Sequence, residues 1–227
     1  MYREIRQSVR GESILEVGSG IGTYSEMLYR DFRGRLFLLE VDSSYVAQLK
    51  RKFPDDRVTV RKLDLTRWED FLALRDLRFD TIVCMNVLEH ISDDVLALRR
   101  MRSLLSENGI LILLVPAHRC LYNTIDEVVG HKRRYAKQEL LSKLTSSGFL
   151  IRRLSYYDMF GILGWYVSGN VLKRRHPPSA SMAFKYFDML VPGFQLVERL
   201  LPYRPTGISI IAICSAAQPL QSHHWPQ

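Results

Sequence analysis

The sequence predicts an α/β domain in which a mainly parallel sheet is covered by helices on both faces. Short apolar runs alternate with amphipathic helical patterns through the first two thirds of the chain, and five such runs precede Pro116. Strands that are apolar along their whole length and separated by helices are typical of a parallel sheet that is buried on both sides. Two further apolar runs follow, so we expect seven strands.

The expected elements follow from these patterns. The predicted strands are 13–17, 36–41, 58–62, 80–85, 110–115, 149–156 and 207–215, and the predicted helices are 22–32, 44–52, 67–74, 93–105 and 137–146. Ser92 is the predicted N-cap of its helix, because a hydroxyl can accept from a free N–H group. Asn108-Gly109 is expected to form the turn before the fifth strand, and Gly148 to end the last helix.

Length and composition indicate a single globular domain. The chain has 227 residues, of which 47% are hydrophobic and 25% charged, and this excludes long disorder and a polytopic membrane protein. Within that domain we distinguish a first half (1–115), a loop and helix (116–156), an aromatic and basic insertion (157–206) and a last strand (207–217).

The net charge of +8 is concentrated in the second half. The residues through Leu113 include 18 basic and 18 acidic side chains, whereas the remainder includes 14 basic and 6 acidic ones. This asymmetry suits an anionic partner, although a solvated basic surface explains it equally well.

Cysteine usage and the first residues favour a cytoplasmic location. Cys84, Cys120 and Cys214 are widely spaced, so neither a disulfide framework nor a zinc site is expected, and no metal ligand is assigned. Residues 1–10 contain three arginines and no apolar stretch of the kind found in signal peptides. The longest apolar stretch, 159–172, is too short to cross a bilayer but can lie on one.

A glycine-rich turn follows the first predicted strand. The sequence from Ile14 to Gly22 reads ILEVGSGIG, an apolar strand that runs into glycines at the start of a helix. Glycines here permit positive φ and close approach of a ligand to the backbone, and free helical N–H groups are expected to face it. The turn therefore predicts a nucleotide-type cofactor, although a G-x-G-x-G pattern alone is weak evidence.

Acidic residues follow the next two strands. Asp42 comes twenty residues after Gly22, at the end of the second strand, where a carboxylate can accept from both hydroxyls of a ribose. Asp64, next to Leu65, follows the third strand, where a carboxylate can hold an adenine amino group. The fourth strand continues into the block FDTIVCMNVLEHI from Phe79 to Ile91.

From Ile14 to Val115 the sequence resembles the class I S-adenosylmethionine-dependent methyltransferases. The glycine turn, the acids after strands two and three and the LEHI block occur in the family's order. The resemblance implies a Rossmann-like fold whose last strand is inserted antiparallel, with S-adenosylmethionine as cofactor and S-adenosylhomocysteine as product. It assigns Glu16, Gly18, Gly20 and Gly22 to the methionine pocket, Asp42 to the ribose, Asp64 and Leu65 to adenine, and Asn86 and Val87 to the sulfonium.

Other interpretations of these residues stay open. An NAD-dependent dehydrogenase would need its third glycine where Thr23 stands. Glu16 can be a structural carboxylate of the glycine loop, and Asp42 can simply cap the next helix. For Glu89 and His90 we favour a structural role in the loop after strand four.

The loop after the fifth strand is the candidate acceptor site, because open α/β folds place their reactive crevice at this edge of the sheet. Its VPAH, LY, DE and GHKRRY segments resemble a subgroup of these methyltransferases linked to glycan, lipid or secondary-metabolite pathways. His131 is the first candidate base and His118 the second, because imidazole titrates near neutral pH. Asp126 or Glu127 would orient that histidine or bind the acceptor.

Some residues of this loop have structural alternatives. Asp126, Glu127, Arg133 and Arg134 can form an ion-pair lattice that closes a lid, and Tyr135 can cover the cofactor or simply pack. The expected reaction is methyl transfer to oxygen or nitrogen of a hydrophobic or carrier-linked small molecule. A non-methylating cyclase or a regulatory protein with the same fold is the alternative.

The insertion 157–206 is rich in aromatic and basic residues. It can form a lid that touches a membrane through 159–175, or it can be a dimer contact or additional core. No motif that reads nucleic acid is present, and nothing in the sequence fixes the oligomeric state.

Overall fold

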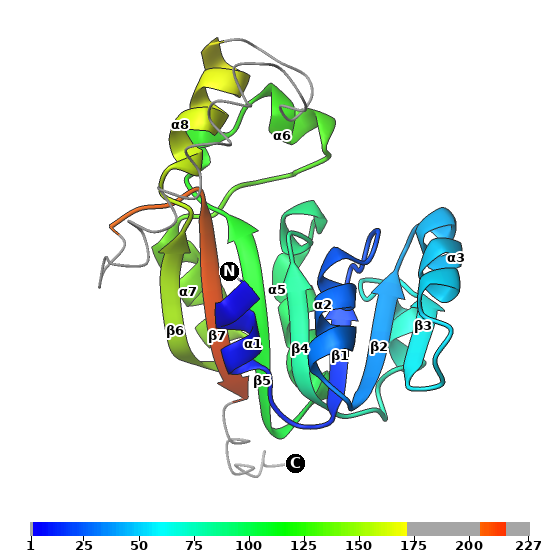
Figure 1. Cartoon of the computed structure of the whole chain (residues 1–227). Helices are drawn as coiled ribbons and strands as arrows, with labels where there is room; N and C mark the ends of the chain where they lie inside the picture. Colours follow the sequence, from blue (N-terminus) through cyan, green and yellow to red (C-terminus); the bar gives the residue numbers. More distant parts are fainter. Residues whose placement is uncertain (1, 172–204, 217–227) are drawn as a thin grey trace, which may run out of the picture.

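A computed structural model of the chain describes residues 2–171 and 205–216. A seven-stranded sheet with strand order β3-β2-β1-β4-β5-β7-β6 forms its centre (Figure 1). Strands β1 to β5 run parallel, and β7 lies antiparallel between β5 and β6. The strands are β1 (Ser13–Val17), β2 (Arg35–Glu40), β3 (Val58–Lys62), β4 (Phe79–Met85), β5 (Leu105–Pro116), β6 (Phe149–Tyr157) and β7 (Ser209–Ala216). The predicted seven-stranded Rossmann-like sheet is confirmed.

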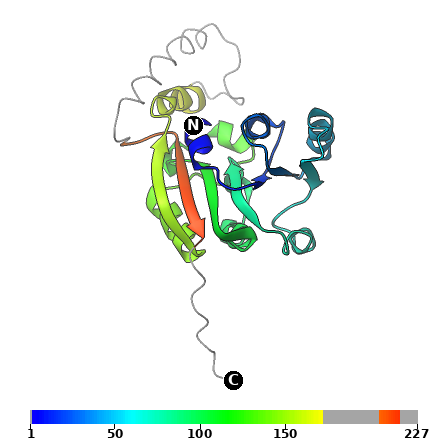
Figure 2. The ribbon, with the colours of Figure 1, turned by 60° about the horizontal axis from the view of Figure 1, so that its bottom comes forward.

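Helices cover both faces of this sheet (Figure 2). They are α1 (Tyr2–Ser8), α2 (Thr23–Asp31), α3 (Ser43–Lys52), α4 (Trp68–Leu72), α5 (Asp94–Leu104), α6 (Thr124–Val128), α7 (Lys137–Ser146) and α8 (Gly161–Tyr166). Two 3-10 turns, η1 (Leu88–His90) and η2 (Arg119–Leu121), and a π-helical turn η3 (Val167–Val171) complete the described part. The predicted bounds hold for β1, β3 and α7.

Alternation along the strands divides the core into two layers. Leu15 of β1 and Ile82 of β4 face one side, where they pack against Leu98 of α5. Their neighbours Ile14 and Val83 face the other side and belong to the layer that α1, α2 and α3 cover. Both faces of the central strands are therefore apolar, as a sheet buried between two helical layers requires.

Two local predictions differ from the structure, and a third agrees with it. The N-cap of α5 is Asp93, whose carboxylate accepts from the backbone of Leu96, and not Ser92. Asn108-Gly109 does not start β5, because the strand begins at Leu105 and these residues lie within an irregularity of its pairing with β4. Gly148 follows the C-cap of α7 with a φ of 82°, as predicted for a helix end.

Helices α1, α6 and α8 were not predicted. Each has at most seven residues, too few to produce a clear amphipathic period. Helices α6 and α8 lie beyond the carboxyl ends of the parallel strands (Figure 1), the edge where the sequence predicts the functional site. In the described ranges, none of the helices combines the length and the apolar character needed to cross a bilayer.

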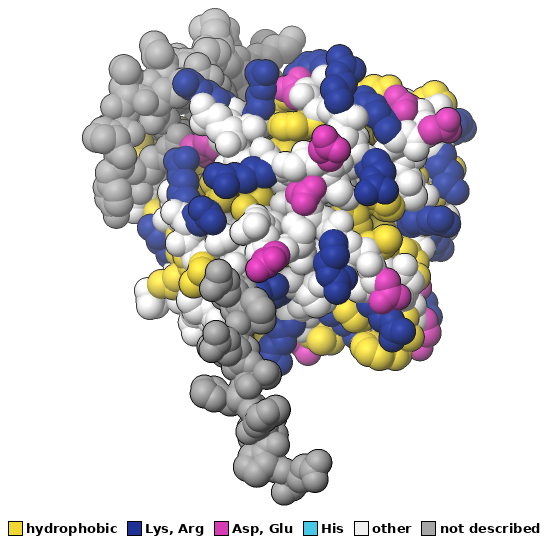
Figure 3. Space-filling view, turned by 90° about the horizontal axis from the view of Figure 1, so that it is seen from below, with side chains coloured by type: hydrophobic (Ala, Val, Ile, Leu, Met, Phe, Trp, Pro, Cys, Tyr) yellow, Lys and Arg dark blue, Asp and Glu magenta, His cyan; other side chains and the backbone are white. Residues whose placement is uncertain are grey.

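The opposite end of the molecule has a mixed surface. Seen from below, Lys and Arg side chains are scattered among Asp and Glu on the described part of the surface (Figure 3). The basic excess of the second half of the chain therefore does not gather into a single patch on this face.

Candidate active site

A cavity of about 750 Å³ lies at the carboxyl ends of β1, β2 and β4. Its lining combines an apolar floor with acidic residues at the ends of the strands. Seven residues predicted to bind the cofactor line it, namely Gly18, Gly20, Asp42, Asp64, Leu65, Asn86 and Val87. Further lining residues include Glu40, Tyr45, His90, Ile91 and Lys132. This volume suits a cofactor of nucleotide size, since ligand pockets generally occupy about 300–1,000 Å³.

The glycine loop between β1 and α2 requires its glycines. Gly18, Gly20 and Gly22 have φ values of 73°, 51° and 81°, a region that other residues rarely adopt. A Cβ atom on Gly18 would lie 2.3 Å from Cγ2 of Val87, so a side chain here would collide with the wall of the cavity.

Three backbone amides of this loop are bonded within the protein. The N–H groups of Gly18 and Ser19 both donate to the carbonyl of Leu39, at 2.9 and 3.0 Å. The N–H of Gly20 donates to the Glu40 carboxylate at 2.7 Å. The loop is therefore held against the end of β2 before any ligand arrives.

Glu40 is a functional candidate that the sequence analysis missed. Its Oε2 accepts from Gly20, and its Oε1 accepts from the backbone N–H groups of Val41 and Asp42 at 2.8 and 3.0 Å. One buried carboxylate thus joins the glycine loop to the turn that carries Asp42. An acidic residue inside an apolar strand, two positions before Asp42, was the available signal.

Asp42 makes the capping contacts considered for it and also reaches the cavity, whereas its contact with a ribose stays a prediction. It lines the cavity, and its Oδ1 also accepts from the backbone N–H groups of Ser44 and Tyr45 as the N-cap of α3. The hydrogen bonds from Ser44 lower the pKa of Asp42, so the side chain is a carboxylate at neutral pH. The hydrogen bonds to the start of α3 hold the negatively charged Asp42 carboxylate at the edge of the cavity.

The other predicted cofactor residues line the opposite walls. Oδ1 of Asp64 accepts from the backbone and hydroxyl of Thr66, at 2.8 and 2.7 Å, which leaves the rest of the carboxyl group for other partners. Asn86 has a φ of 54° and donates its N–H to the Leu114 carbonyl. This backbone conformation directs the chain from β4 into the η1 turn and positions Val87 against Gly18.

Glu16 and Gly22 do not line the cavity. Glu16 is 2% exposed, accepts from the Ser25 hydroxyl and has its pKa raised to about 8 by burial. These contacts favour the structural alternative, in which Glu16 holds the start of α2. A Cβ on Gly22 would lie 2.8 Å from the Leu49 side chain, so this glycine allows α2 and α3 to approach.

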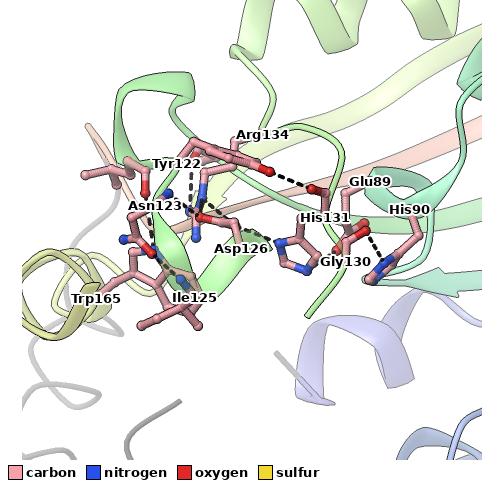
Figure 4. A network of polar contacts seen from close by, with 12 residues as sticks. Glu89, His90, Tyr122, Asn123, Ile125, Asp126, Gly130, His131, Arg134 and Trp165 are labelled. Atoms are coloured by element: carbon pink, nitrogen blue, oxygen red, sulfur yellow. Dashed lines mark hydrogen bonds and ion pairs between the residues drawn. The ribbon is translucent and has the colours of Figure 1, made fainter. Parts of the chain in front are cut away.

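The loop between β5 and α7 brings Asp126 and His131 together, as predicted. Nδ1 of His131 lies 2.7 Å from Oδ1 of Asp126 (Figure 4). Arg134 donates through Nε to both oxygens of Asp126, at 3.0 and 2.9 Å, and Asp126 is fully buried. Burial acts to raise the pKa of Asp126, but the hydrogen bonds from His131 and Arg134 outweigh it and lower the pKa.

An ionised Asp126 determines the tautomer of His131. A carboxylate only accepts hydrogen bonds, so Nδ1 of His131 must carry the hydrogen and neutral His131 has its lone pair on Nε2. That Nε2 lies 3.7 Å from Oε1 of Glu89. His131 is therefore oriented on one side and has an electron pair available on the other.

Glu89 and His90, in the η1 turn after β4, contact the same loop. Nδ1 of His90 lies 3.0 Å from the Gly130 carbonyl, and its ring packs edge-on against that of His131 with centroids 4.8 Å apart. Burial lowers the pKa of His90. The Glu89 backbone carbonyl accepts from Lys132, while its fully buried carboxyl group has no hydrogen-bond partner among the described residues. The turn therefore anchors the loop, as the structural interpretation expects.

The remaining acceptor-side candidates differ in position. Nε2 of His118 lies 2.8 Å from the hydroxyl of Thr206, and its ring stacks on that of Tyr156. Glu127 is exposed. Tyr135 is fully buried and donates to Asp94 at 2.9 Å, which agrees with its packing alternative.

The ion-pair lattice exists in part. Arg134 pairs with Asp126, but Arg133 pairs with Asp94 of α5 at 2.9 Å. Most of the insertion 157–206 lies outside the described residues, as does the basic run Lys173 to Arg175. Helix α8 lies within them and exposes Leu163, so contact with a membrane through 159–175 stays a prediction.

Comparisons with known proteins agree with this architecture. Residues 15–113 match a family model described as a methyltransferase domain. A probable S-adenosylmethionine-dependent methyltransferase of Mycolicibacterium smegmatis is 26% identical over 151 residues, which cover 66% of this chain and 56% of that protein. The chain thus spans little more than half the length of this curated relative.

Solved structures share the fold. The S-adenosylmethionine-dependent methyltransferase of Mesorhizobium loti superposes with a TM-score of 0.64 at 14% identity, covering 94% of this chain and 95% of that one. The [4+2]-cyclase SpnF superposes with a TM-score of 0.63 at 18% identity, covering 95% and 79%. At these identities the likeness concerns the fold alone.

The residues present fit S-adenosylmethionine. A carboxylate at Asp42 suits a ribose, Asp64 suits an amino group, and the absence of a side chain on Gly18 keeps the wall at Val87 clear. The fold, the cavity and the family match agree: residues 15–113 belong to a methyltransferase domain that has the fold of the class I S-adenosylmethionine-dependent enzymes.

Proposed function

We propose that this chain transfers the methyl group of S-adenosylmethionine to an oxygen or nitrogen of a small acceptor, hydrophobic or carrier-linked, that binds beside His131. One observation carries the proposal. His90 lines the cofactor cavity, and its ring contacts that of His131, whose orientation Asp126 fixes. The cofactor cavity and an oriented imidazole are therefore neighbours.

The proposed roles follow from these contacts. When bound, S-adenosylmethionine supplies a methyl group attached to a positively charged sulfur. The glycine loop, Asp42 and Val87 hold and orient it, which matters because alignment of the reacting atoms supplies much of the rate in such displacements. Nε2 of His131 would accept the proton of the acceptor's hydroxyl or amine while the methyl carbon exchanges its bond to sulfur for a bond to the acceptor. Asp126 is a positioning residue that keeps the required tautomer of His131.

Cofactor binding is tested at Asp42. Asp42→Ala should weaken the affinity for S-adenosylhomocysteine roughly 10- to 100-fold, equal to about 1.4–2.7 kcal/mol, because the carboxylate that accepts from both ribose hydroxyls is lost. Isothermal titration calorimetry on the full chain measures this loss.

The control separates binding from helix capping. Asp42→Ser keeps an N-cap for α3, so it should retain the melting temperature but still bind the ligand weakly. Wild-type affinity in both variants, or no affinity in the parent chain, would refute the cofactor assignment. Binding without formation of S-adenosylhomocysteine over a broad set of acceptors would instead favour the alternative of a non-methylating cyclase; SpnF, which shares the fold, is a [4+2]-cyclase.

His131→Gln should lower turnover at least roughly tenfold and leave cofactor affinity nearly unchanged, since general bases typically contribute 10²–10⁴-fold. Turnover is measured as S-adenosylhomocysteine formed with an acceptor found by screening small hydroxyl and amine compounds. His118→Gln is the matched control, because this histidine contacts Thr206 and Tyr156 and should have little effect. Unchanged turnover in His131→Gln would remove His131 from the proposed machinery.

A further inference from the structure

We infer that Glu89, His90 and His131 form a binding site for one divalent transition-metal ion of the zinc type. Each of the three side chains offers one ligand atom, and these atoms all lie within 4.8 Å of one another. Two imidazoles and one carboxylate are a common ligand set for such ions, which leaves coordination positions open for water or substrate.

Both histidines are prepared to bind through Nε2. A backbone carbonyl only accepts, so Nδ1 of His90 carries the hydrogen that it donates to Gly130 at 3.0 Å. Nδ1 of His131 donates in the same way to Asp126 at 2.7 Å. Metal-binding histidines typically donate their other ring N–H to a carbonyl or carboxylate, which fixes the ring and raises the basicity of the ligand nitrogen.

The third ligand is a buried carboxyl group that lacks a partner. Glu89 is 0% exposed, and neither of its oxygens has a hydrogen bond among the described residues. Burying such a group without a partner is costly, and an ion would remove that cost. Its Oε1 already lies 3.7 Å from Nε2 of His131, so the carboxyl group is directed at the histidine pair.

The nearby basic side chains have partners other than Glu89. Arg134 pairs with Asp126 through both carboxylate oxygens, and Arg133 pairs with Asp94. The nearby ammonium group of Lys132 donates to the hydroxyl of Ser92. A divalent ion therefore adds positive charge where a carboxyl group is unpaired.

The site requires side-chain movements of about an ångström. In the tetrahedral arrangement usual for zinc, ligand atoms about 2.1 Å from the ion lie about 3.4 Å apart, so a pair separated by 4.8 Å must close by about 1.4 Å. His90 is half-buried and His131 retains 13% exposure, so neither ring is fully enclosed by the protein. Because His90 lines the cofactor cavity, the open coordination positions lie next to it.

The inference rests on the proposed function in one respect only, namely the acceptor that would occupy an open coordination position of the ion. With an ion bound, Nε2 of His131 is one of its ligands and is no longer available to the acceptor. The acceptor's oxygen or nitrogen would then bind directly to the ion. Metal binding itself needs neither cofactor nor acceptor, so it can be tested separately from methyl transfer.

The test is calorimetric titration of zinc chloride into the chelator-treated full chain. We expect one equivalent to bind, and Glu89→Gln and His90→Gln each to weaken the affinity roughly tenfold or more. Cobalt in place of zinc should give visible absorption that these variants change. His118→Gln, a histidine outside the trio, should bind like the parent chain. Equal affinity in Glu89→Gln and His90→Gln, or the absence of stoichiometric binding, would overturn the inference and assign any bound zinc to other groups such as Cys120.

Melting temperatures show whether a variant that fails to bind zinc is still folded. Glu89→Gln replaces a buried carboxyl group that has no hydrogen-bond partner by a neutral side chain of the same shape, so without zinc it should melt no lower than the parent chain. Zinc should raise the melting temperature of the parent, because a ligand that binds only the folded state stabilises it, and should not raise that of Glu89→Gln. An equal rise in both proteins would contradict the site.

Discussion

Gly18→Ala should weaken cofactor binding roughly 100-fold, equal to about 2.7 kcal/mol. The new Cβ would lie 2.3 Å from Cγ2 of Val87, and a φ of 73° costs a non-glycine residue about 1–2 kcal/mol. Because Val87 belongs to the wall of the cavity, relief of the collision must move either that wall or the loop. Affinity for S-adenosylhomocysteine, measured by calorimetry, reports the change.

A double variant distinguishes collision from backbone strain. Val87→Ala removes the atoms that the new Cβ would meet, so Gly18→Ala combined with Val87→Ala should regain part of the affinity. If Gly18→Ala binds the ligand like the parent chain, the loop is not the close-fitting wall that the geometry describes. If the double variant recovers nothing, strain at φ of 73° dominates and the contact with Val87 is secondary.

Arg134→Met should destabilise the fold by about 3 kcal/mol, because it leaves the buried Asp126 charge without its ion-pair partner. The Arg134 side chain is 1% exposed, donates to both Asp126 oxygens and lies over the Trp165 ring, 4.5 Å from its centroid. In a chain of this length, 1 kcal/mol corresponds to about 2–4 °C of melting temperature, so we expect a fall of roughly 6–12 °C. Differential scanning calorimetry gives the value.

Arg119→Met is the matched control for this substitution. Arg119 pairs with Glu139, but its side chain is 68% exposed, and exposed pairs contribute only about 0–1 kcal/mol. The two variants should therefore differ clearly in melting temperature. Equal melting temperatures would mean that the Arg134–Asp126 pair contributes no more than a surface contact.

Much of the fold could be predicted because local patterns and burial agree. Strands β1 and β3 and helix α7 have the predicted bounds, since the hydrophobic periodicity of the sequence changes at the ends of these elements. That the predicted residues from Gly18 to Val87 line one cavity could be foreseen, because they follow parallel strands whose carboxyl ends meet at one edge.

What the sequence could not predict depends on contacts between distant segments. Glu40 was overlooked because its importance lies in a hydrogen bond to Gly20, twenty residues earlier. The proximity of Glu89 to His131 requires the loop after β5 to fold back over the turn after β4. The assignment of Glu16 to the methionine pocket followed the family resemblance, whereas in the structure its carboxyl group is directed toward Ser25 and away from the cavity.

The order in which the strands assemble has a consequence for synthesis of the chain. Strand β7 pairs with β5 on one side and with β6 on the other, although both are translated well before it. Until Ser209–Ala216 leaves the ribosome, the neighbouring edges of β5 and β6 have no native partner, and a direct pairing between them would be a misfolded trap. Complete native pairing of β5 and β6 therefore has to wait until β7 has been synthesised.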